Sequence, residues 1–410
     1  MPHPRLLPLI GRPPEWPGEG LDVARLRAQG WRPTPFRDVV LKVHQRCNLA
    51  CDYCYVYTMA DQSWRDRPLV MSREVWRATA ARMREHADAH DLPGMRLVLH
   101  GGEPLLAGRE RLAELIGDFR AVFDGSGRHL DIQMQTNGVL LDDDLLELFR
   151  RHGLRVGVSL DGPPGQNDLR RRTADGRGSS VAVDRALRRL TGPRFREIFA
   201  GLLCVVDPAV DPIACYEALL AYSPPAIDLL LPHANWSSPP APGTPHADWL
   251  IAVFDRWYDA PRQETGVRLF EDLLALLLGG SSRSEQVGLS PVAVVVVETD
   301  GTLEQVDSLK SAYQGAAATG LSVAAHPFDA ALDHPGIVAR QIGELALGET
   351  CRSCPSHRVC GGGHYAHRYR AGEGFRNPSV YCADMLKLIA HVAGRATADL
   401  QRLAEPPRID

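Results

Sequence analysis

Three cysteines lie within eight residues of this chain, in the segment Cys47-Asn-Leu-Ala-Cys51-Asp-Tyr-Cys54. A tetrahedral zinc site takes four ligands, which usually come as two separated pairs. Three thiolates on one short loop instead suit a cubane [4Fe–4S] cluster, whose irons are ordinarily capped by cysteine. One iron then stays open to a small molecule. The loop alone leaves a zinc knuckle and a chance grouping as alternatives.

Three further segments combine glycine with polar side chains, and each closes a short apolar run. They are His100-Gly101-Gly102-Glu103-Pro104, Gln135-Thr136-Asn137-Gly138 and Val158-Ser159-Leu160-Asp161-Gly162. Each lies where an expected strand ends, which in a β/α barrel is the edge that binds ligands. Small residues there let the backbone approach a ligand closely. Taken singly, Gly101-Gly102 also fits a strand-to-helix turn, and Ser159 and Asp161 also fit helix caps.

A second group of cysteines lies late in the chain. Cys351-x2-Cys354-x5-Cys360, followed by Cys382, supplies four soft ligands. Spacing alone slightly favours zinc, because four-cysteine sites that start with C-x2-C are common. Two further cysteines, Cys204 and Cys215, lie in an apolar strand and a helix, and we expect both to be buried structural thiols.

Strand and helix signals alternate between residues 37 and 232 and would position these residues. We expect strands near 38–43, 95–100, 130–135, 154–159, 198–206 and 226–231, with amphipathic helices such as 73–89, 109–123 and 142–151. Six strand–helix repeats predict an α/β protein with a parallel sheet, closed as a partial (β/α)6 barrel. Such a barrel has a wider mouth than a closed one, which suits a peptide substrate.

The remaining segments define the expected domains. Residues 1–36 are a proline-rich extension over the barrel, 37–235 are the barrel, 236–290 are a helical connector, and 291–410 are a smaller domain. Helices are expected near 246–260, 267–279 and 383–403, and a hairpin at Asp300-Gly301. The proline-rich loop 232–245 should lie at the barrel mouth, either as a surface linker or in contact with substrate.

Composition excludes several classes of protein. The chain has 410 residues, 44% hydrophobic and 23% charged, which is enough for two globular domains. A net charge of −4 gives no support for nucleic-acid binding. We expect no membrane span, because the longest apolar runs are far shorter than the ~20 residues required. Without a signal-like N-terminus the protein is expected to be cytoplasmic, where cysteines ligate metals rather than form disulfides.

The cysteine loop and the three glycine-containing segments, in this order, resemble the radical S-adenosylmethionine (SAM) enzymes. The resemblance implies a [4Fe–4S] cluster on Cys47, Cys51 and Cys54, and SAM chelated to its open iron. It further implies cofactor-binding roles for Tyr53, Gly101, Gly102, Glu103, Gln135, Asn137, Ser159, Asp161 and Arg171.

The implied roles differ among these residues. Glu103 and the Gly101-Gly102 backbone would receive the amino group of SAM, and Tyr53 would lie against the adenine. Ser159 and Arg171 would hold the carboxylate, a bidentate task that suits arginine. Arg171 belongs to the basic run 170–172, which could equally be a solvated helix start.

The C-terminal third resembles the SPASM extension of peptide-modifying radical SAM enzymes, and more closely the FxsB-type radical SAM/SPASM peptide maturases. The resemblance is carried by residues 297–301, 305–310, 360–369 and 374–382. It favours iron–sulfur over zinc at Cys351, Cys354, Cys360 and Cys382. The usual SPASM run has a further cysteine where this chain has His364, and Val306 stands at another expected cysteine. We therefore predict two [4Fe–4S] clusters rather than three.

The resemblance implies that the enzyme joins an aromatic ring to a β-carbon in a ribosomally synthesised precursor peptide, forming a cyclophane. An external electron donor of the flavodoxin or ferredoxin type would reduce the first cluster, and the second would accept the electron released by the crosslink. Asp307 is the predicted catalytic base, with a hairpin-capping carboxylate as the alternative. His364, Tyr365, His367 and Arg368 either line a cavity between the domains or have structural roles.

Other outcomes stay open. Related enzymes form thioether bridges, epimerise residues or make formylglycine, and peptide mass separates several of these. A protein that binds zinc or an iron–sulfur cluster only to recognise a partner is the non-enzymatic alternative, and it would not cleave SAM.

Overall fold

The computed structural model describes residues 21–404, and ten strands within them form one sheet. Six neighbouring strands run parallel in chain order. They are β1 (Asp38–His44), β2 (Gly94–Gly101), β3 (His129–Thr136), β4 (Arg155–Ser159), β5 (Phe199–Val205) and β6 (Ala226–Leu230). The six predicted strands are confirmed, because every end differs from the prediction by at most one residue.

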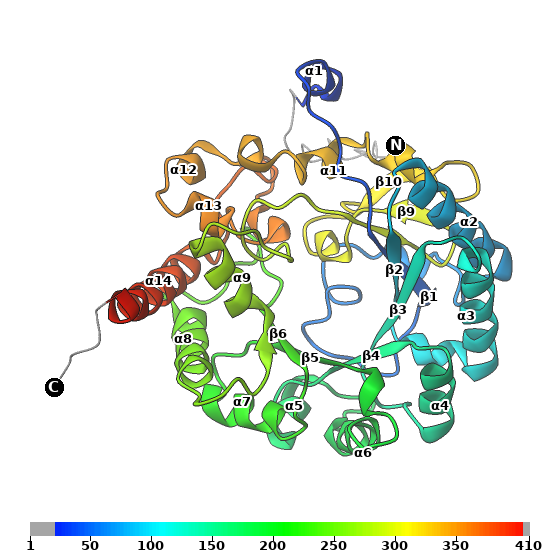
Figure 1. Cartoon of the computed structure of the whole chain (residues 1–410), viewed down its shortest axis with the longest axis horizontal. Helices are drawn as coiled ribbons and strands as arrows, with labels where there is room; N and C mark the ends of the chain where they lie inside the picture. The colour runs from blue at the N-terminus through cyan, green and yellow to red at the C-terminus, as the bar shows by residue number, and fades with distance from the viewer. Residues whose placement is uncertain (1–20, 405–410) are drawn as a thin grey trace, which may run out of the picture.

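Helices cover the outside of this curved sheet, as Figure 1 shows. They are α2 (Arg73–Ala89), α3 (Arg109–Phe123), α4 (Asp143–Arg151), α5 (Pro164–Arg170), α6 (Ser180–Leu190) and α7 (Pro212–Leu220). Helix α4 starts one residue later than predicted, because Asp142 is its cap and accepts a hydrogen bond from the Leu145 backbone at 2.9 Å. The predicted α/β fold with a partial (β/α)6 barrel is confirmed.

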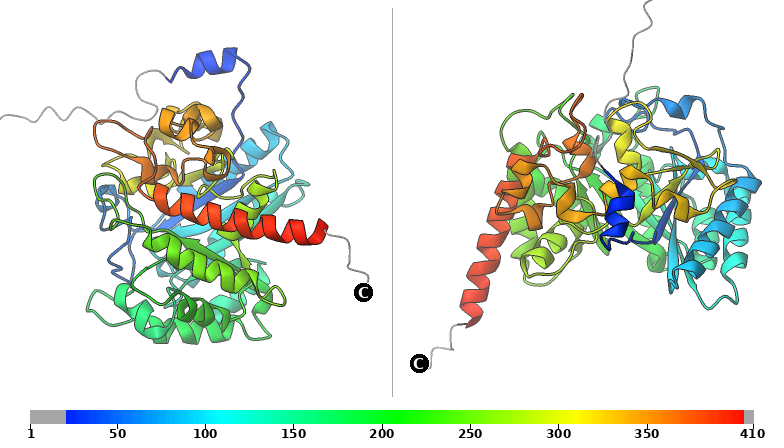
Figure 2. Two further views of the ribbon diagram at one scale, coloured as in Figure 1. Left: turned by 90° about the vertical axis from the view of Figure 1, so that its left-hand side faces the viewer. Right: turned by 90° about the horizontal axis from the view of Figure 1, so that it is seen from above.

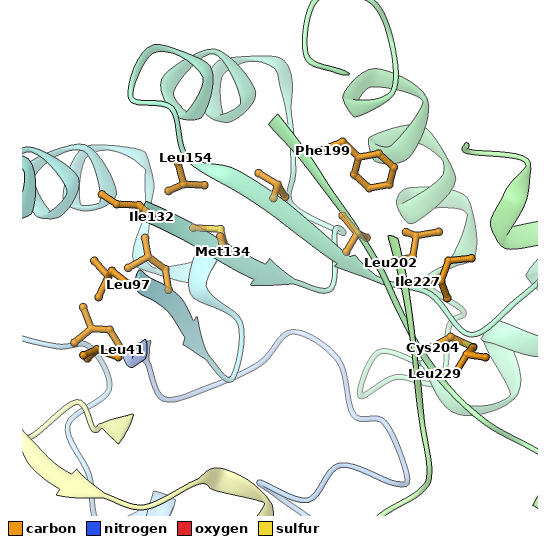
Figure 3. Close-up of a cluster of buried hydrophobic side chains, with 14 of the residues drawn as sticks. Leu41, Leu97, Ile132, Met134, Leu154, Phe199, Leu202, Cys204, Ile227 and Leu229 are labelled. Carbon is orange, nitrogen blue, oxygen red and sulfur yellow. The ribbon is translucent and has the colours of Figure 1, made fainter. Parts of the chain in front are cut away.

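An apolar layer between the strands and the outer helices makes the barrel rigid. Burial alternates along β3, so that every second side chain lies in this layer. Figure 3 shows how side chains from neighbouring strands join into one cluster, among them Leu41, Leu97, Ile132, Met134, Leu154, Phe199, Leu202, Ile227 and Leu229. Burying each contributes about 1.5–3 kcal/mol. The carboxyl ends of the strands are therefore held in fixed positions.

The sheet continues into the C-terminal third of the chain. Strand β8 (Val294–Val297) pairs in parallel with β1, and β9 (Thr302–Glu304) returns antiparallel to β8, which confirms the predicted hairpin. Strand β10 (Ala318–Ser322) then pairs with β9. The division at residue 291 stays a prediction, since the sheet crosses it. By pairing with β1, strand β8 covers an edge that would otherwise expose a row of unpaired backbone donors and acceptors.

A layer of helices joins the end of the barrel to the end of the chain. Helices α8 (Pro245–Tyr258) and α9 (Arg268–Leu277) flank the short β7 (Gly266–Val267), close to the predicted positions. The long α14 (Cys382–Ala404) lies along α8, as Figure 2 shows. Asp384 accepts from the Ala247 backbone at 2.8 Å, and His391 contacts Asp255 at 2.7 Å.

Short elements complete the described chain. They are α1 (Val23–Ala28), α10 (Phe328–Ala331), α11 (Pro335–Ala339), α12 (Glu349–Arg352), α13 (His357–Cys360) and the 3₁₀ helices η1 (Ser63–Arg65), η2 (Pro104–Ala107), η3 (Arg196–Ile198), η4 (Asp307–Ser311), η5 (Gly343–Ala346) and η6 (Tyr365–Arg368). Of the predicted extension, residues 1–20 lie outside the described residues. The part after them contacts the C-terminal third, because Arg27 pairs with Asp333 and Thr34 bonds to Gln341. Between residues 21 and 404, no helix has both the length and the apolar character to cross a membrane.

Candidate active site

The loop that carries the first three cysteines packs directly on the end of β2. The Gly102 backbone donates to His44 O, and the Glu103 backbone donates to Arg46 O, each at 2.9 Å. A Cβ atom on Gly102 would lie 1.9 Å from the Tyr57 hydroxyl and 2.4 Å from Arg46 O. Glycine is therefore required here by contacts within the protein, in addition to the close ligand approach expected from the sequence.

Cys47, Cys51 and Cys54 share a cavity of about 200 Å³. Burial raises the pKa of the Cys47 thiol to about 11 and that of Cys51 to about 12, and neighbouring thiols add to both shifts. Such buried thiols stay protonated until a metal takes the place of the proton. Asn137 Nδ2 and the Leu49 backbone approach Cys47 Sγ at 3.5 and 3.4 Å, as expected around a metal-bound sulfur. The three cysteines that line this cavity therefore supply a donor set that fits a cluster with an open iron.

Opposite charges meet at the polar side of this cavity. The Tyr53 hydroxyl donates to Asp161 Oδ2 at 2.5 Å and accepts from Arg171 Nη1 at 2.7 Å. Burial alone would lower the pKa of Arg171, but Tyr53 and Asp161 outweigh it and keep the guanidinium charged. Among the described residues, nothing pairs with the buried Arg171 Nε. A buried donor without a partner is costly, so this nitrogen suits an anionic ligand group.

Hydrogen bonds tie the strand ends around the cavity together. The Glu103 carboxylate, 1% exposed, accepts from Thr136 Oγ1 at 2.6 Å and from the Asn137 backbone at 2.8 Å, which joins β2 to β3. Gln135 Nε2 donates to Ser159 Oγ at 2.9 Å and joins β3 to β4. Glu103 thus has a clear structural function.

All the cofactor-binding residues predicted from the sequence line this one cavity. They are Tyr53, Gly101, Gly102, Glu103, Gln135, Asn137, Ser159, Asp161 and Arg171. The sequence interpretation missed Tyr55, His100 and His233, which line the same cavity. The position of His100 and His233 at the ends of β2 and β6 is the signal that could have identified them.

Two larger cavities adjoin the cysteine cavity. One of about 630 Å³ lies in the barrel and shares Tyr55, His100 and His233 with it. The other, of about 430 Å³, shares Tyr53, Asp161 and His233 and is walled by the proline-rich loop at residues 238–241. That loop is anchored rather than free, because Asn235 Nδ2 donates to Ser311 O at 2.8 Å and the Trp236 backbone to Tyr369 O at 2.9 Å.

Asp307 lies outside these cavity walls, in a buried cluster of charges. Its carboxylate contacts Lys42 Nζ at 2.6 Å and Lys310 Nζ at 3.0 Å. Burial alone would raise the pKa of Asp307, but Lys310 and Lys42 outweigh it and hold the pKa well below its usual range. Val306 occupies the cap position of η4, so the Asp307 carboxylate is not the cap of this helix. Lys42 Nζ also lies 3.5 Å from Nδ1 of His100, which links the carboxylate to the cavity wall.

The four C-terminal cysteines converge between α12, α13 and the start of α14. Burial raises the pKa of Cys360 to about 11, with Cys382 and Cys351 adding to the shift. Burial also raises the pKa of Cys382, and Cys351 and Cys354 add to that shift. Consecutive left-handed glycines follow Cys360, and a Cβ on Gly361 would lie 1.7 Å from Gly288 O. This donor set fits a four-cysteine metal centre.

Cys204 and Cys215 are 1% and 2% exposed, with sulfurs 3.8 Å apart. Their prediction as buried thiols is confirmed.

Known proteins share this fold. Residues 41–205 match the family model described as the Radical SAM superfamily. The cysteine-type anaerobic sulfatase-maturating enzyme of Clostridium perfringens (strain 13 / Type A) is 27% identical over 274 residues, which are 64% of this chain and 71% of that protein.

Two solved structures extend the likeness into the C-terminal third. The structure of anSMEcpe with bound AdoMet superposes on this chain with a TM-score of 0.78 at 20% sequence identity. The superposition covers 89% of this chain and 99% of the anSMEcpe chain. The structure of Streptococcus suis SuiB bound to its precursor peptide SuiA gives a TM-score of 0.56 at 13% sequence identity. This superposition covers 86% of this chain and 77% of the SuiB chain. At these identities they show the fold alone.

Proposed function

Because this chain is a radical SAM enzyme, we propose that it modifies a ribosomally synthesised precursor peptide by joining an aromatic ring to the β-carbon of a nearby residue. The product is a cyclophane. The adjoining cavities support this proposal most directly. The barrel cavity of about 630 Å³ meets the cysteine cavity at Tyr55, His100 and His233, and its size suits side chains of a peptide.

The chain offers a complete set of residues for the cofactors. When bound, SAM and a [4Fe–4S] cluster, reduced by an external donor of the flavodoxin or ferredoxin type, would supply the radical chemistry that removes a hydrogen atom, while the protein would orient the reactants and exclude water. Cys47, Cys51 and Cys54 would hold the cluster. Arg171, with Ser159, would hold the SAM carboxylate, and the strand ends around Gly102 and Glu103 would face its amino group.

Peptide substrates are also supported by the related structures. SuiB is known with its precursor peptide bound, and anSMEcpe with the Cp18Cys peptide bound. The proline-rich loop of this chain walls a cavity that reaches Tyr53 and His233, which offers a peptide a second way to the cysteine cavity.

Forming the crosslink removes two hydrogen atoms from the peptide. One is taken as an atom from the β-carbon, and the ring must then lose one electron and one proton. A second [4Fe–4S] cluster on Cys351, Cys354, Cys360 and Cys382 would accept the electron, so the proposed total is two clusters. Asp307 is the proposed acceptor of the proton. The proton would reach it from the substrate cavity by way of His100 and Lys42, because Lys42 contacts both His100 on the cavity wall and the Asp307 carboxylate.

Co-expression with neighbouring small open reading frames tests the proposal. The expected product has lost two hydrogens and gives no fragments between the joined residues in tandem mass spectrometry. The Cys47→Ala variant, as a matched control, should leave the peptide unmodified. A product that reacts with hydroxylamine would instead contain an aldehyde. That outcome would favour formylglycine chemistry, the second candidate, which the likeness to sulfatase-maturating enzymes supports.

A further inference from the structure

We propose that His233, His364 and His367 form a binding site for one divalent first-row metal ion, separate from the two cysteine centres. His233 follows β6 at the barrel edge, whereas His364 and His367 lie at η6 in the C-terminal third. The fold thus brings together ligands from two distant segments. Three imidazoles with an open fourth position are a common ligand set for zinc.

The three rings already face one another. Their centroids lie 5.6 Å apart for His233 and His364, 5.7 Å for His233 and His367, and 4.8 Å for His364 and His367. One nitrogen from each ring lies within 4.8 Å of the other two. Tetrahedral zinc with bonds of about 2.0–2.1 Å needs ligand nitrogens about 3.3 Å apart. Rotation of the three side chains can bring the nitrogens from within 4.8 Å of one another to this shorter spacing.

The nitrogens are available for coordination. Among the described residues, His233 Nδ1 and His367 Nε2 are buried and have no hydrogen-bond partner. His367 is only 3% exposed. Burial lowers the pKa of His233 and of His364 to about 3, so both rings are neutral at pH 7 and keep a lone pair. The Ala366 backbone donates to His364 Nδ1 at a long 3.3 Å, and coordination through this atom would replace that bond.

A fourth ligand can reach the ion from the barrel cavity, because all three histidines line it. Arg340 and Arg368 act on His364 as nearby positive charges, so an anionic fourth ligand would suit the site. His364 also occupies the position at which the SPASM pattern, which this segment resembles, has a cysteine. An imidazole in place of a thiolate keeps a metal-ligating side chain at this position.

Two other clusters of potential ligands differ from this one. His86 Nδ1 and His90 Nε2 both hydrogen-bond to Asp329 Oδ1, and His86 Nε2 accepts from the Phe36 backbone, so both nitrogens of His86 and one of His90 already have partners. The carboxylates of Glu298, Glu304 and Asp307 are paired with Lys310, Lys42 and Arg67. Only the three-histidine cluster combines converging ligands with unpaired nitrogens among the described residues.

The test uses the full chain with both cysteine centres reconstituted with iron and sulfide. After incubation with Zn²⁺ and removal of excess metal, we expect about one zinc per chain, with nitrogen neighbours at about 2.0–2.1 Å in zinc-edge X-ray absorption. Zinc on cysteines left without iron would show sulfur at about 2.3 Å. No retained zinc, or sulfur neighbours alone, would overturn the proposal.

Variants make the assignment specific. His367→Ala should weaken zinc binding at least tenfold. His364→Cys should keep the ion and add one sulfur neighbour at about 2.3 Å, a result that needs a folded, occupied site. His246→Asn is the control, because His246 is a buried neighbour that packs on Tyr381 outside the cluster. An unchanged spectrum for His364→Cys, or equal loss of zinc in His246→Asn and His367→Ala, would refute the site.

Discussion

Replacing Arg171 with lysine should weaken SAM binding while leaving the fold intact. In the structure Arg171 is 7% exposed, and its guanidinium donates to the Tyr53 hydroxyl at 2.7 Å and lies 4.0 Å from Asp161. Its Nε has no partner within the described chain. Lysine keeps the positive charge beside Asp161, but it lacks the planar fork that binds a carboxylate through two parallel hydrogen bonds.

The size of the effect follows from the number of bonds lost. A hydrogen bond to a charged group contributes about 1.5–3 kcal/mol. Lysine can replace at most one of the two bonds to the SAM carboxylate. Since each 1.4 kcal/mol is a factor of ten, the dissociation constant should rise roughly 10- to 150-fold.

Equilibrium dialysis of SAM against anaerobically reconstituted protein measures this constant directly, and 5′-deoxyadenosine release at high SAM shows whether cleavage recovers. Arg170→Lys is the matched control. Arg170 is partly exposed and pairs with Asp52 and Asp207, and such pairs contribute about 0.2–1 kcal/mol, so SAM binding should change less than fivefold. If Arg171→Lys bound SAM within about threefold of the unchanged protein, Arg171 would not hold the carboxylate.

Three further predictions concern other parts of the molecule. Asp307→Asn should slow crosslinking but spare SAM cleavage without peptide, because the carboxylate is proposed to accept the proton of the crosslinking step through Lys42. Full crosslinking activity in this variant would exclude Asp307 as the base. Cys351→Ser should lower the iron content from about eight to about four atoms per chain, since each cubane holds four irons; about twelve atoms in the unchanged protein would contradict the two-cluster proposal. The pKa of His367 lies well below its usual value because the ring is buried, so the unfolded chain binds a proton more readily and the free energy of unfolding falls as pH drops below about 6.5. Denaturant unfolding of metal-free protein at pH 7 and 5.5 should show a smaller fall for His367→Gln, by up to about 1.4 kcal/mol per pH unit; equal falls would rule out a neutral buried ring.

Local patterns in the sequence determined the barrel and the wall of the cysteine cavity. Alternating burial, as in β3, can be read from neighbouring residues, and the end of each such strand identifies the edge where ligands bind. This pattern placed Glu103 and Ser159 at that edge, but their cofactor-binding roles, like that of Arg171, came from the resemblance of the sequence to a family. The spacing of Cys47, Cys51 and Cys54 left zinc open as an alternative, and the family resemblance was needed to favour an iron–sulfur cluster.

Long-range pairing decided the rest. No local signal joins β8 to β1, because the two strands are far apart in sequence and meet only when the sheet assembles. Asp307 could be placed on a hairpin from the sequence, but Lys42, which holds its charge, comes 265 positions earlier. His233 and His367 also become neighbours only in the folded protein. The sequence by itself determined which side chains stand at the strand ends; the tertiary structure decided which of them share a cavity, because burial and pairing depend on contacts between distant segments.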